Sequence, residues 1–334
     1  MSAADALLDA GVLESGPVLE FQATLAVRAH GGTAVLPWRA EYLAARAEGL
    51  AALPAAAVLA EESFAQAVVH LQPSRAGTLA DVAEVWRVLR PGGRLLVVGQ
   101  NELGIASFVK GLARALGQEA AVVANRGKGR IVLFRRTGEA PSAPLPVRHT
   151  LPAPAGTGEL SLLVPPGVFS AEHPDVGTLV LLDALREQRL NPELVLDPGS
   201  GAGHLAISAL LRWPEARAVL ADADWRAVLA ARANLQALGL AERAEVHWWD
   251  ASEPLPARGA DLVLLNPPWH TGSAVDLALA GRFFHAVAGA TGRGACVLVV
   301  ANRRLPYEAE LGRMGRVREL CHERGFKVLE VVRG

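Results

Sequence analysis

The segment Asp197-Pro-Gly-Ser-Gly-Ala-Gly203 joins an apolar run, Glu193 to Leu196, to a helical pattern that begins near His204. Glycines allow a sharp backbone turn and the close approach of a ligand, and a helix amino terminus favours a carboxylate. Further elements alternate downstream: helix His204 to Trp213, strand Ala216 to Ala221, helix Trp225 to Leu238, strand near Ala244 to Trp249 and strand Asp261 to Leu265. This alternation predicts a parallel sheet with helices on both faces.

The length and a proline-rich stretch predict two domains. A chain of 334 residues exceeds what one hydrophobic core usually organises. Between about Gly138 and Gly158 the chain is rich in proline and cannot sustain a helix. We therefore expect a first domain at 1–140, a linker at 141–158 and a second domain at 159–334.

The first half holds a fainter copy of the second. The runs Ala67 to Pro73 and Leu89 to Gly99 resemble Asp261 to Pro267 and Thr291 to Ala301, with a helical pattern between the members of each pair. The first 60 residues lack the glycine turn, and Gln72-Pro-Ser74 stands where the second half has Asn-Pro-Pro. The pattern indicates a duplication whose first copy has lost catalysis and serves structure or substrate capture. An unrelated α/β domain is the alternative.

Composition limits the classes of function. The formal charge of −1 excludes a strongly basic polyelectrolyte binder, so any nucleic-acid site must be local. Cys296 and Cys321 suggest neither a disulfide framework nor a zinc site. Met1 to Glu14 does not resemble a signal peptide, and no window approaches the roughly 18 apolar residues of a membrane span. We expect a soluble, cytoplasmic, monomeric protein without a metal or a membrane partner.

The acids near the glycine turn favour S-adenosylmethionine as the cofactor. A dinucleotide fingerprint would place its third glycine at position 204, which is histidine here, and Asp197 suits a cationic amino-acid end better than a pyrophosphate. The next strand ends at Ala221-Asp-Ala-Asp224, where Asp222, beside Ala223, is placed to accept from both ribose hydroxyls. Asp224 is the second candidate for holding the ribose, or it caps the following helix. Asp250 is either an acceptor for the adenine amine or a turn acid.

Asn266-Pro-Pro-Trp269 follows the last of these strands, where active sites of open α/β sheets lie. Two prolines hold Asn266 and the neighbouring carbonyls in a fixed arrangement. If the Asn266 oxygen and the Pro267 carbonyl each accept an N–H of a planar amine, its lone pair is freed for a methyl group. Trp269 is placed to stack on a base, or it packs in the ordinary way.

From about Leu163 to the end, the chain closely resembles the RsmC-like family of ribosomal RNA guanine-N2 methyltransferases. The resemblance rests on Pro166-Gly-Val-Phe-Ser170 with Asp175 and Gly177, the glycine turn, Asn266 to His270, Ala301-Asn302, and Leu305-Pro-Tyr307. It implies two tandem Rossmann-like methyltransferase domains of the α/β class with mixed seven-stranded sheets, the first degenerate. Trp269 and Pro198 depart from the family pattern, which more often has Phe or Tyr and Val or Leu there.

The resemblance also implies roles for individual residues. Gly199, Gly201 and Gly203, with Ser200 and Ala202 between them, would hold the methionine portion of S-adenosylmethionine. Phe169, Asp175 and Thr178 would border the cofactor, Asp222 would hold the ribose and Asp250 the adenine. Residues Asn266 to Trp269 would hold the target guanine. The implied substrate is 16S ribosomal RNA or the 30S subunit, at the family's guanine 1207 site, although the residues do not identify the nucleotide.

Two basic clusters are candidate RNA contacts. Arg126, Lys128 and Arg130 lie among glycines in the first half, while Arg303 and Arg304 follow a strand end in the second. Such side chains fix the register of a nucleic acid through its phosphates, or they simply form a solvated surface. Two further functions remain open: another amine methyltransferase, of protein glutamine N5 or nucleic-acid adenine N6, and a non-catalytic RNA-binding assembly factor.

Overall fold

The computed structural model describes residues 11–154, 158–268, 270–271, 274–275 and 277–334. The chain divides into two compact units, and the boundary between them in the sequence falls between Leu145 and Pro146. This boundary lies within the proline-rich stretch. Each unit is described by itself.

The first unit is built on a seven-stranded sheet of order β3-β2-β1-β4-β5-β7-β6. Neighbours from β3 to β5 are parallel, whereas β7 runs antiparallel to both β5 and β6. Its strands are β1 (Val18–Phe21), β2 (Gly32–Val35), β3 (Ala52–Leu53), β4 (Phe64–His70), β5 (Leu89–Gln100), β6 (Ala121–Arg126) and β7 (Gly129–Arg135). Its helices are α2 (Leu25–His30), α3 (Arg39–Ala47), η1 (Ala56–Val58), α4 (Arg75–Val88) and α5 (Ile105–Leu116).

The second unit repeats this topology, with the order β12-β11-β10-β13-β16-β18-β17. The strands of the sheet are β10 (Leu194–Pro198), β11 (Arg217–Asp222), β12 (Ala244–Trp248), β13 (Ala260–Leu265), β16 (Thr291–Asn302), β17 (Gly315–Glu323) and β18 (Phe326–Arg333). Antiparallel pairs are formed by β8 (Val147–Pro152) with β9 (Glu159–Val164), and by β14 (His270–Thr271) with β15 (Ala274–Val275). The helices are α6 (Val176–Arg186), α7 (His204–Arg212), α8 (Trp225–Ala237), η2 (Ala241–Arg243), α9 (Leu277–Ala290) and α10 (Glu308–Leu311).

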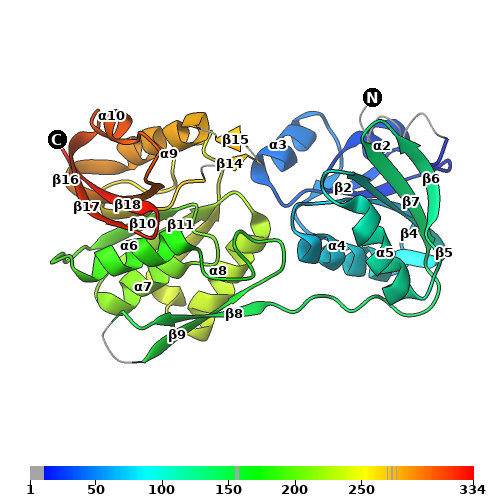
Figure 1. The fold of residues 1–334 in the computed structure, drawn as a ribbon, viewed down its shortest axis with the longest axis horizontal. Coiled ribbons are helices and arrows are strands. Elements are labelled where there is room, and N and C mark those ends of the chain that lie inside the picture. The colour runs from blue at the N-terminus through cyan, green and yellow to red at the C-terminus, as the bar shows by residue number, and fades with distance from the viewer. Residues whose placement is uncertain (1–10, 155–157, 269, 272–273, 276) are drawn as a thin grey trace. The chain divides into compact units, whose positions relative to one another are not determined.

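The second sheet is buried on both faces, as its continuous apolar strands predict. On β13, Leu262 and Leu264 pack with α6, α7 and α8, while Val263 and Leu265 pack with α9 and α10. The two groups of helices cover opposite faces of the sheet in Figure 1. The predicted α/β class with two tandem, mixed seven-stranded sheets is therefore confirmed.

The registers show which residues of the two sheets are equivalent. In the first sheet Val69 lies opposite Val97, and in the second Leu265 lies opposite Val299. The backbone N–H of Gln22 donates to Val35 just as that of Gly199 donates to Ala221. These registers place His70 at the position of Asn266. The sequence comparison, which placed Gln72-Pro-Ser74 opposite Asn266-Pro-Pro268, is therefore wrong by two residues.

The same registers show how the first unit is degenerate. Its turn between β1 and α2 spans three residues, 22–24, whereas the turn between β10 and α7 spans five, 199–203. Leu36, which is buried, takes the position of Asp222. Of the acids in the second unit's turn, only Asp197 has an acidic equivalent, Glu20. A shorter turn and an apolar side chain at the ribose position leave this unit without the features expected of an adenosyl site.

Glu20 has become a structural residue of the first unit. It is fully buried, its Oε2 accepts the backbone N–H groups of Ala26 (2.8 Å) and Val27 (3.0 Å), and its Oε1 lies 2.8 Å from Nε2 of His70. We expect Glu20→Ala to lower the stability of β1 and α2 by about 2–4 kcal/mol, because buried donors would lose their acceptor. Hydrogen exchange of these segments measures the effect, and Glu61→Gln, which is exposed and outside both segments, is the control. Unchanged protection of β1 would contradict the assignment.

Candidate active site

The glycine turn lies where the strand order of the second sheet reverses. In the sheet, β10 has β11 as its neighbour on one side and β13 on the other. Ligands of open α/β sheets bind at this point. Gly199, Gly201 and Gly203 all have left-handed φ angles, of 77°, 54° and 93°. The φ of Gly203 favours glycine, whereas the 3.0 Å between a Cβ placed there and Cδ1 of Ile207 would require only a small shift of that side chain.

Asp197 presents an unpaired carboxylate oxygen beside this turn. The residue is fully buried, and its Oδ2 accepts the backbone N–H of Ala206 at 3.0 Å. In the described part of the chain, neither its Oδ1 nor the Oγ of Ser200 has a hydrogen-bond partner. Burial, and to a smaller extent the neighbouring Asp222 carboxylate, raises the pKa of the Asp197 carboxyl to about 7. Buried polar atoms without partners are costly, so both atoms are matched to a ligand that supplies donors.

Asp222 ends β11 and closes the turn from the other side. Its Oδ2 accepts the N–H of Gly201 (2.7 Å) and its Oδ1 accepts that of Asp224 (2.9 Å), which leaves each oxygen a second lone pair. Burial raises the pKa of its carboxyl to about 6. Asp224 instead caps α8 through the N–H of Arg226 and pairs with the guanidinium of that residue. Asp224 therefore stabilises the helix, in agreement with the capping alternative.

Asn266 is held with its amide group in one orientation. Its Nδ2 donates to Oδ2 of Asp175 (2.8 Å) and to Oγ1 of Thr178 (2.9 Å). A carboxylate only accepts, so the amide nitrogen must face Asp175 and the amide oxygen must face away. Asp175 is itself fixed because it caps α6 through the N–H of Thr178. The amide oxygen Oδ1 of Asn266 therefore points away from these two acceptors and is placed to accept a hydrogen bond from a substrate amine.

A single pocket lies against the turn and Asn266. It is lined by Phe169, Ser170, Asp175, Thr178, the turn residues 199–202, Leu205, Asn266, His149 and His204. Phe169 is 69% exposed, and Ser170 after it has a left-handed φ of 53°. Eight of the sequence-predicted residues thus meet in one place. His149 and His204 were missed; position 204 was noted only because it is not glycine.

The other predicted residues that the structure describes, Asp197 and Asp222 among them, lie outside this lining. Asp250 accepts the backbone N–H and the hydroxyl of Ser252, as a turn acid does. Pro267 is buried and Pro268 is exposed. Gly203 and Ala223 contribute backbone to the turn and to the end of β11, and Trp248 donates its Nε1–H to the Ala223 carbonyl. Trp269 lies outside the described residues.

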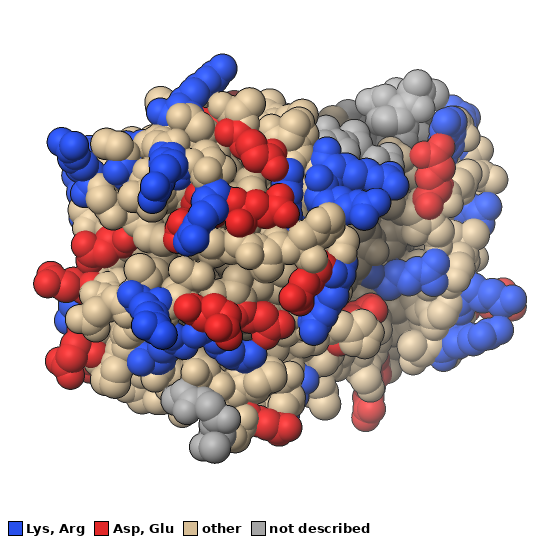
Figure 2. Space-filling view, turned by 60° about the vertical axis from the view of Figure 1, so that its left-hand side comes forward, with Lys and Arg blue, Asp and Glu red and all other residues tan. Residues whose placement is uncertain are grey.

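The basic candidates are exposed, with one exception. Arg126 and Lys128 are exposed at the β6–β7 hairpin, where Lys128 pairs with Glu102, and Arg130 is partly buried. Arg303 and Arg304 are exposed directly after β16. On the face shown in Figure 2, basic and acidic side chains are interspersed. Any RNA contact on that face is therefore local, as the net charge of −1 predicts.

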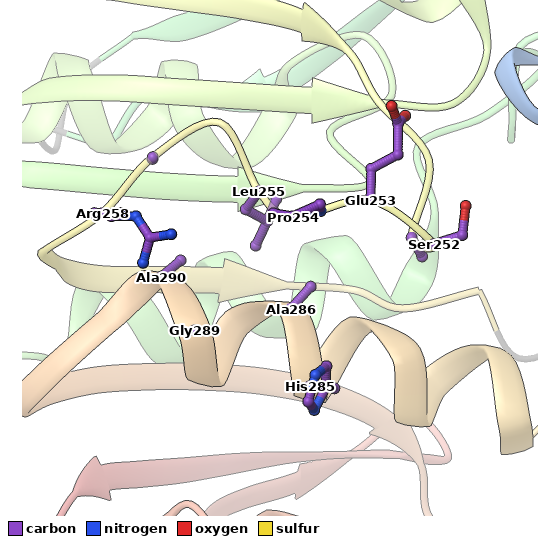
Figure 3. A pocket seen from close by; sticks show the side chains of 11 residues that line it. Ser252, Glu253, Pro254, Leu255, Arg258, His285, Ala286, Gly289 and Ala290 are labelled. Atoms are coloured by element: carbon purple, nitrogen blue, oxygen red, sulfur yellow. The ribbon is translucent and has the colours of Figure 1, made fainter.

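A hollow of about 230 Å³ lies elsewhere in the second unit, between the loop after β12 and α9. Ser252, Arg258 and His285 line it and are all exposed (Figure 3). Ser200, which lines the glycine-turn pocket, has a buried hydroxyl without a hydrogen-bond partner among the described residues, and no residue that lines this hollow has such an atom. Volume alone does not identify the active site.

Two further findings concern the residues that the structure describes. No helix among them is long and apolar enough to cross a bilayer. Within the same residues, His, Cys, Asp and Glu form no group of three or more that could hold a metal ion.

Comparison with known proteins identifies the family. Residues 159–330 match the family model described as "Methyltransferase small domain". The chain belongs to this family. It is 34% identical over 273 residues to the ribosomal RNA small subunit methyltransferase C of Pseudomonas paraeruginosa. This match covers 80% of this chain and 78% of that protein. The predicted resemblance to the RsmC-like enzymes is thereby confirmed.

Other relatives carry a different name. The ribosomal RNA large subunit methyltransferase G of Ectopseudomonas mendocina is 34% identical over 254 residues, 72% of this chain and 64% of that protein. The protein of the same name from Pseudomonas entomophila is 37% identical over 191 residues, 57% and 50% of the two chains. The chain thus spans half to just under two thirds of the length of these relatives.

One solved structure matches both units. It is the T. thermophilus 16S rRNA N2 G1207 methyltransferase (RsmC) in complex with AdoMet and guanosine, with a TM-score of 0.86 and 28% sequence identity. The match covers 99% of this chain and 92% of the other. Tandem units of the same topology are therefore common to both proteins.

Proposed function

We propose that the chain is an S-adenosylmethionine-dependent methyltransferase that modifies the exocyclic N2 amine of a guanine in small-subunit ribosomal RNA. The observation that carries this proposal is the locked amide of Asn266, whose free oxygen lies in the same pocket as the glycine turn. The T. thermophilus structure supports it, because that enzyme matches nearly the whole chain and contains both AdoMet and guanosine.

The residues present fit the cofactor. The unpaired Oδ1 of Asp197 and Oγ of Ser200 would receive the ammonium group of the methionine portion, which satisfies two atoms that are otherwise buried at a cost. Asp222 would accept from the ribose hydroxyls through its remaining lone pairs. The role of Asp250 in holding the adenine stays a prediction. When bound, S-adenosylmethionine supplies an electrophilic sulfonium methyl group.

The chain's own residues would position the amine rather than deprotonate it. The Oδ1 of Asn266 and the carbonyl of Pro267 each accept one N–H of the guanine amine, which directs its lone pair at the methyl carbon. With the cofactor bound, Asn266 and Pro267 would present the amine nitrogen to the sulfonium methyl group, and the electrons of the broken carbon–sulfur bond would remain on sulfur. The methylated nitrogen would then lose one proton to water. No strong general base is required, because that nitrogen is acidic.

The RNA would present an unpaired guanine. N2 takes part in base pairing within a helix, so the target must be single-stranded or flipped out. The exposed Arg303 and Arg304 would contact phosphates beside the site, and Arg126, Lys128 and Arg130 of the first unit would contact other phosphates of the RNA. The cytoplasm is the compartment that this substrate implies.

Large-subunit RNA is the second candidate substrate, because several relatives are named for it. The deciding experiment incubates unmodified 16S RNA, 30S particles, 23S RNA and 50S particles with labelled S-adenosylmethionine and maps the product by mass spectrometry. We expect one N2-methylguanine in the small-subunit RNA. A single product in 23S RNA would replace the proposed substrate, and methylation of adenine or of protein glutamine would refute the guanine assignment.

Asp222 should contribute mainly to the affinity for the cofactor. We expect Asp222→Asn to weaken S-adenosylmethionine binding about tenfold to a hundredfold, since one acceptor for a ribose hydroxyl becomes a donor. Calorimetric titration measures the change. The partly exposed Asp183→Asn, outside the pocket lining, is the matched control and should bind as the unaltered protein does. Equal affinity of the two variants would remove Asp222 from the ribose site.

A further inference from the structure

Two histidines connect the walls of the cofactor pocket. His149, on β8, is 2% exposed, and its Nδ1 lies 3.0 Å from Nε2 of His204, the first residue of α7. On its other side, Nε2 of His149 lies 3.1 Å from the carbonyl oxygen of Ala171. The three groups therefore form one chain of hydrogen bonds.

The positions of the protons follow from these partners. A carbonyl oxygen only accepts, so Nε2 of His149 must carry a hydrogen. In the neutral ring Nδ1 is then an acceptor, and Nε2 of His204 must donate to it. Burial, and to a smaller extent the nearby His149, lowers the pKa of His204 to about 4. Burial also lowers the pKa of His149, although its hydrogen bond with the Ala171 carbonyl acts in the opposite direction. Both imidazoles are therefore neutral at pH 7, and both are Nε2–H tautomers.

The two ends of this chain belong to two segments that both line the pocket. Ala171 follows Phe169 and Ser170, which are in the lining, and the backbone there is fixed by the left-handed φ of Ser170 and by its hydroxyl, which donates to the His173 carbonyl. His204 directly follows Gly203 at the end of the glycine turn, whose residues 199–202 are also in the lining. Because β8 lies outside the main sheet, His149 provides a link between these segments that the sheet itself does not.

We propose that His149 and His204 are positioning residues that hold the Phe169–Ala171 segment against the amino end of α7, and so set the width of the pocket for S-adenosylmethionine. The inference rests on the proposed function for the identity of the ligand. The hydrogen-bonded link itself does not depend on it. Neither ring takes part in methyl transfer, so the pair should affect cofactor affinity and leave the rate at saturation unchanged.

The side chains allow matched substitutions. His149→Phe and His204→Phe keep a ring but remove the hydrogen bonds, and each should weaken S-adenosylmethionine binding about tenfold, with kcat at saturating cofactor within about twofold. His204→Gln retains a donor near the position of Nε2 and should bind within about twofold of the unaltered protein. His149→Gln retains the donor to Ala171 and should lie between the two. Phe variants that bind normally, or that lose kcat instead of affinity, would overturn the proposal.

A spectroscopic test needs no cofactor. Long-range ¹⁵N–¹H spectra of the free protein at pH 7 should show both rings as neutral Nε2–H tautomers. An Nδ1–H tautomer or an imidazolium at either position would overturn the proposal, even if a Phe variant fails to fold. Lack of S-adenosylmethionine binding by the unaltered protein would instead refute the proposed function, and the spectra would still test the link.

Discussion

Asn266→Ala should lower the rate of methyl transfer by about a hundredfold to a thousandfold while the dissociation constant of S-adenosylmethionine changes less than about threefold. The alanine removes the acceptor that directs the lone pair of the amine, and this interaction gains strength as the nitrogen becomes positive. Single-turnover transfer to unmodified ribosomal RNA, at saturating cofactor, measures the chemical step separately from binding. A variant that retains more than a tenth of the rate would remove Asn266 from its assigned role.

Two further substitutions test the reason for this effect. Thr178→Val removes one of the acceptors that orient the Asn266 amide but leaves Asp175 in place, so the rate should fall only about threefold to tenfold. Asn266→Asp would put a carboxylate where Nδ2 now donates to Asp175, and repulsion between the acids should make it at least as slow as the alanine variant. An aspartate variant with normal activity would show that amide orientation does not matter.

The alternation of strands and helices was sufficient to predict the second sheet, because the buried central strands are continuous apolar runs that end at turns. The glycine turn, Asp222 and Asn266 were likewise predictable, since the carboxyl ends of parallel strands meet at one edge. Asp224 shows the limit of this reasoning: the sequence places two acids at one strand end, and only the contact with Arg226 shows which acid caps the helix.

Register and contacts between distant segments were not accessible from the sequence. His70 occupies the position of Asn266 in the first sheet, but the apolar runs of β4 and β13 can also be matched two residues out of register, because side chains repeat every two residues along a strand. His149 and His204 are 55 positions apart, and one lies on a strand outside the sheet. A side-chain hydrogen bond of this kind has no periodic signal.

Asp197 should make cofactor binding depend on pH near neutrality. Its carboxyl has a pKa of about 7 in the unliganded pocket because it is buried, so it is largely protonated at pH 6. A cationic methionine ammonium favours the ionised form, so binding must remove this proton. The dissociation constant should therefore rise about tenfold as the pH falls from 8 to 6, and faster below about pH 6, where Asp222 also becomes protonated. Calorimetry in buffers of different ionisation enthalpy measures both the affinity and the proton released.

Asp197→Asn should separate binding from stability at this position. Without the carboxylate, affinity at pH 8 should fall about a hundredfold and lose most of its dependence on pH between 8 and 6.

The stability of the Asp197→Asn variant should change in the opposite direction. The folded-state pKa is raised from 3.8 to about 7, so in the unliganded protein the stability contributed by this group is lost as the pH rises through that range. Asp197→Asn should therefore raise the free energy of unfolding at pH 8 by about 2–4 kcal/mol and leave it nearly unchanged below pH 4. A variant that is less stable at pH 8 would show that Asp197 is retained for the fold; a more stable one that no longer binds would show that the buried acid is kept for the cofactor at the expense of stability.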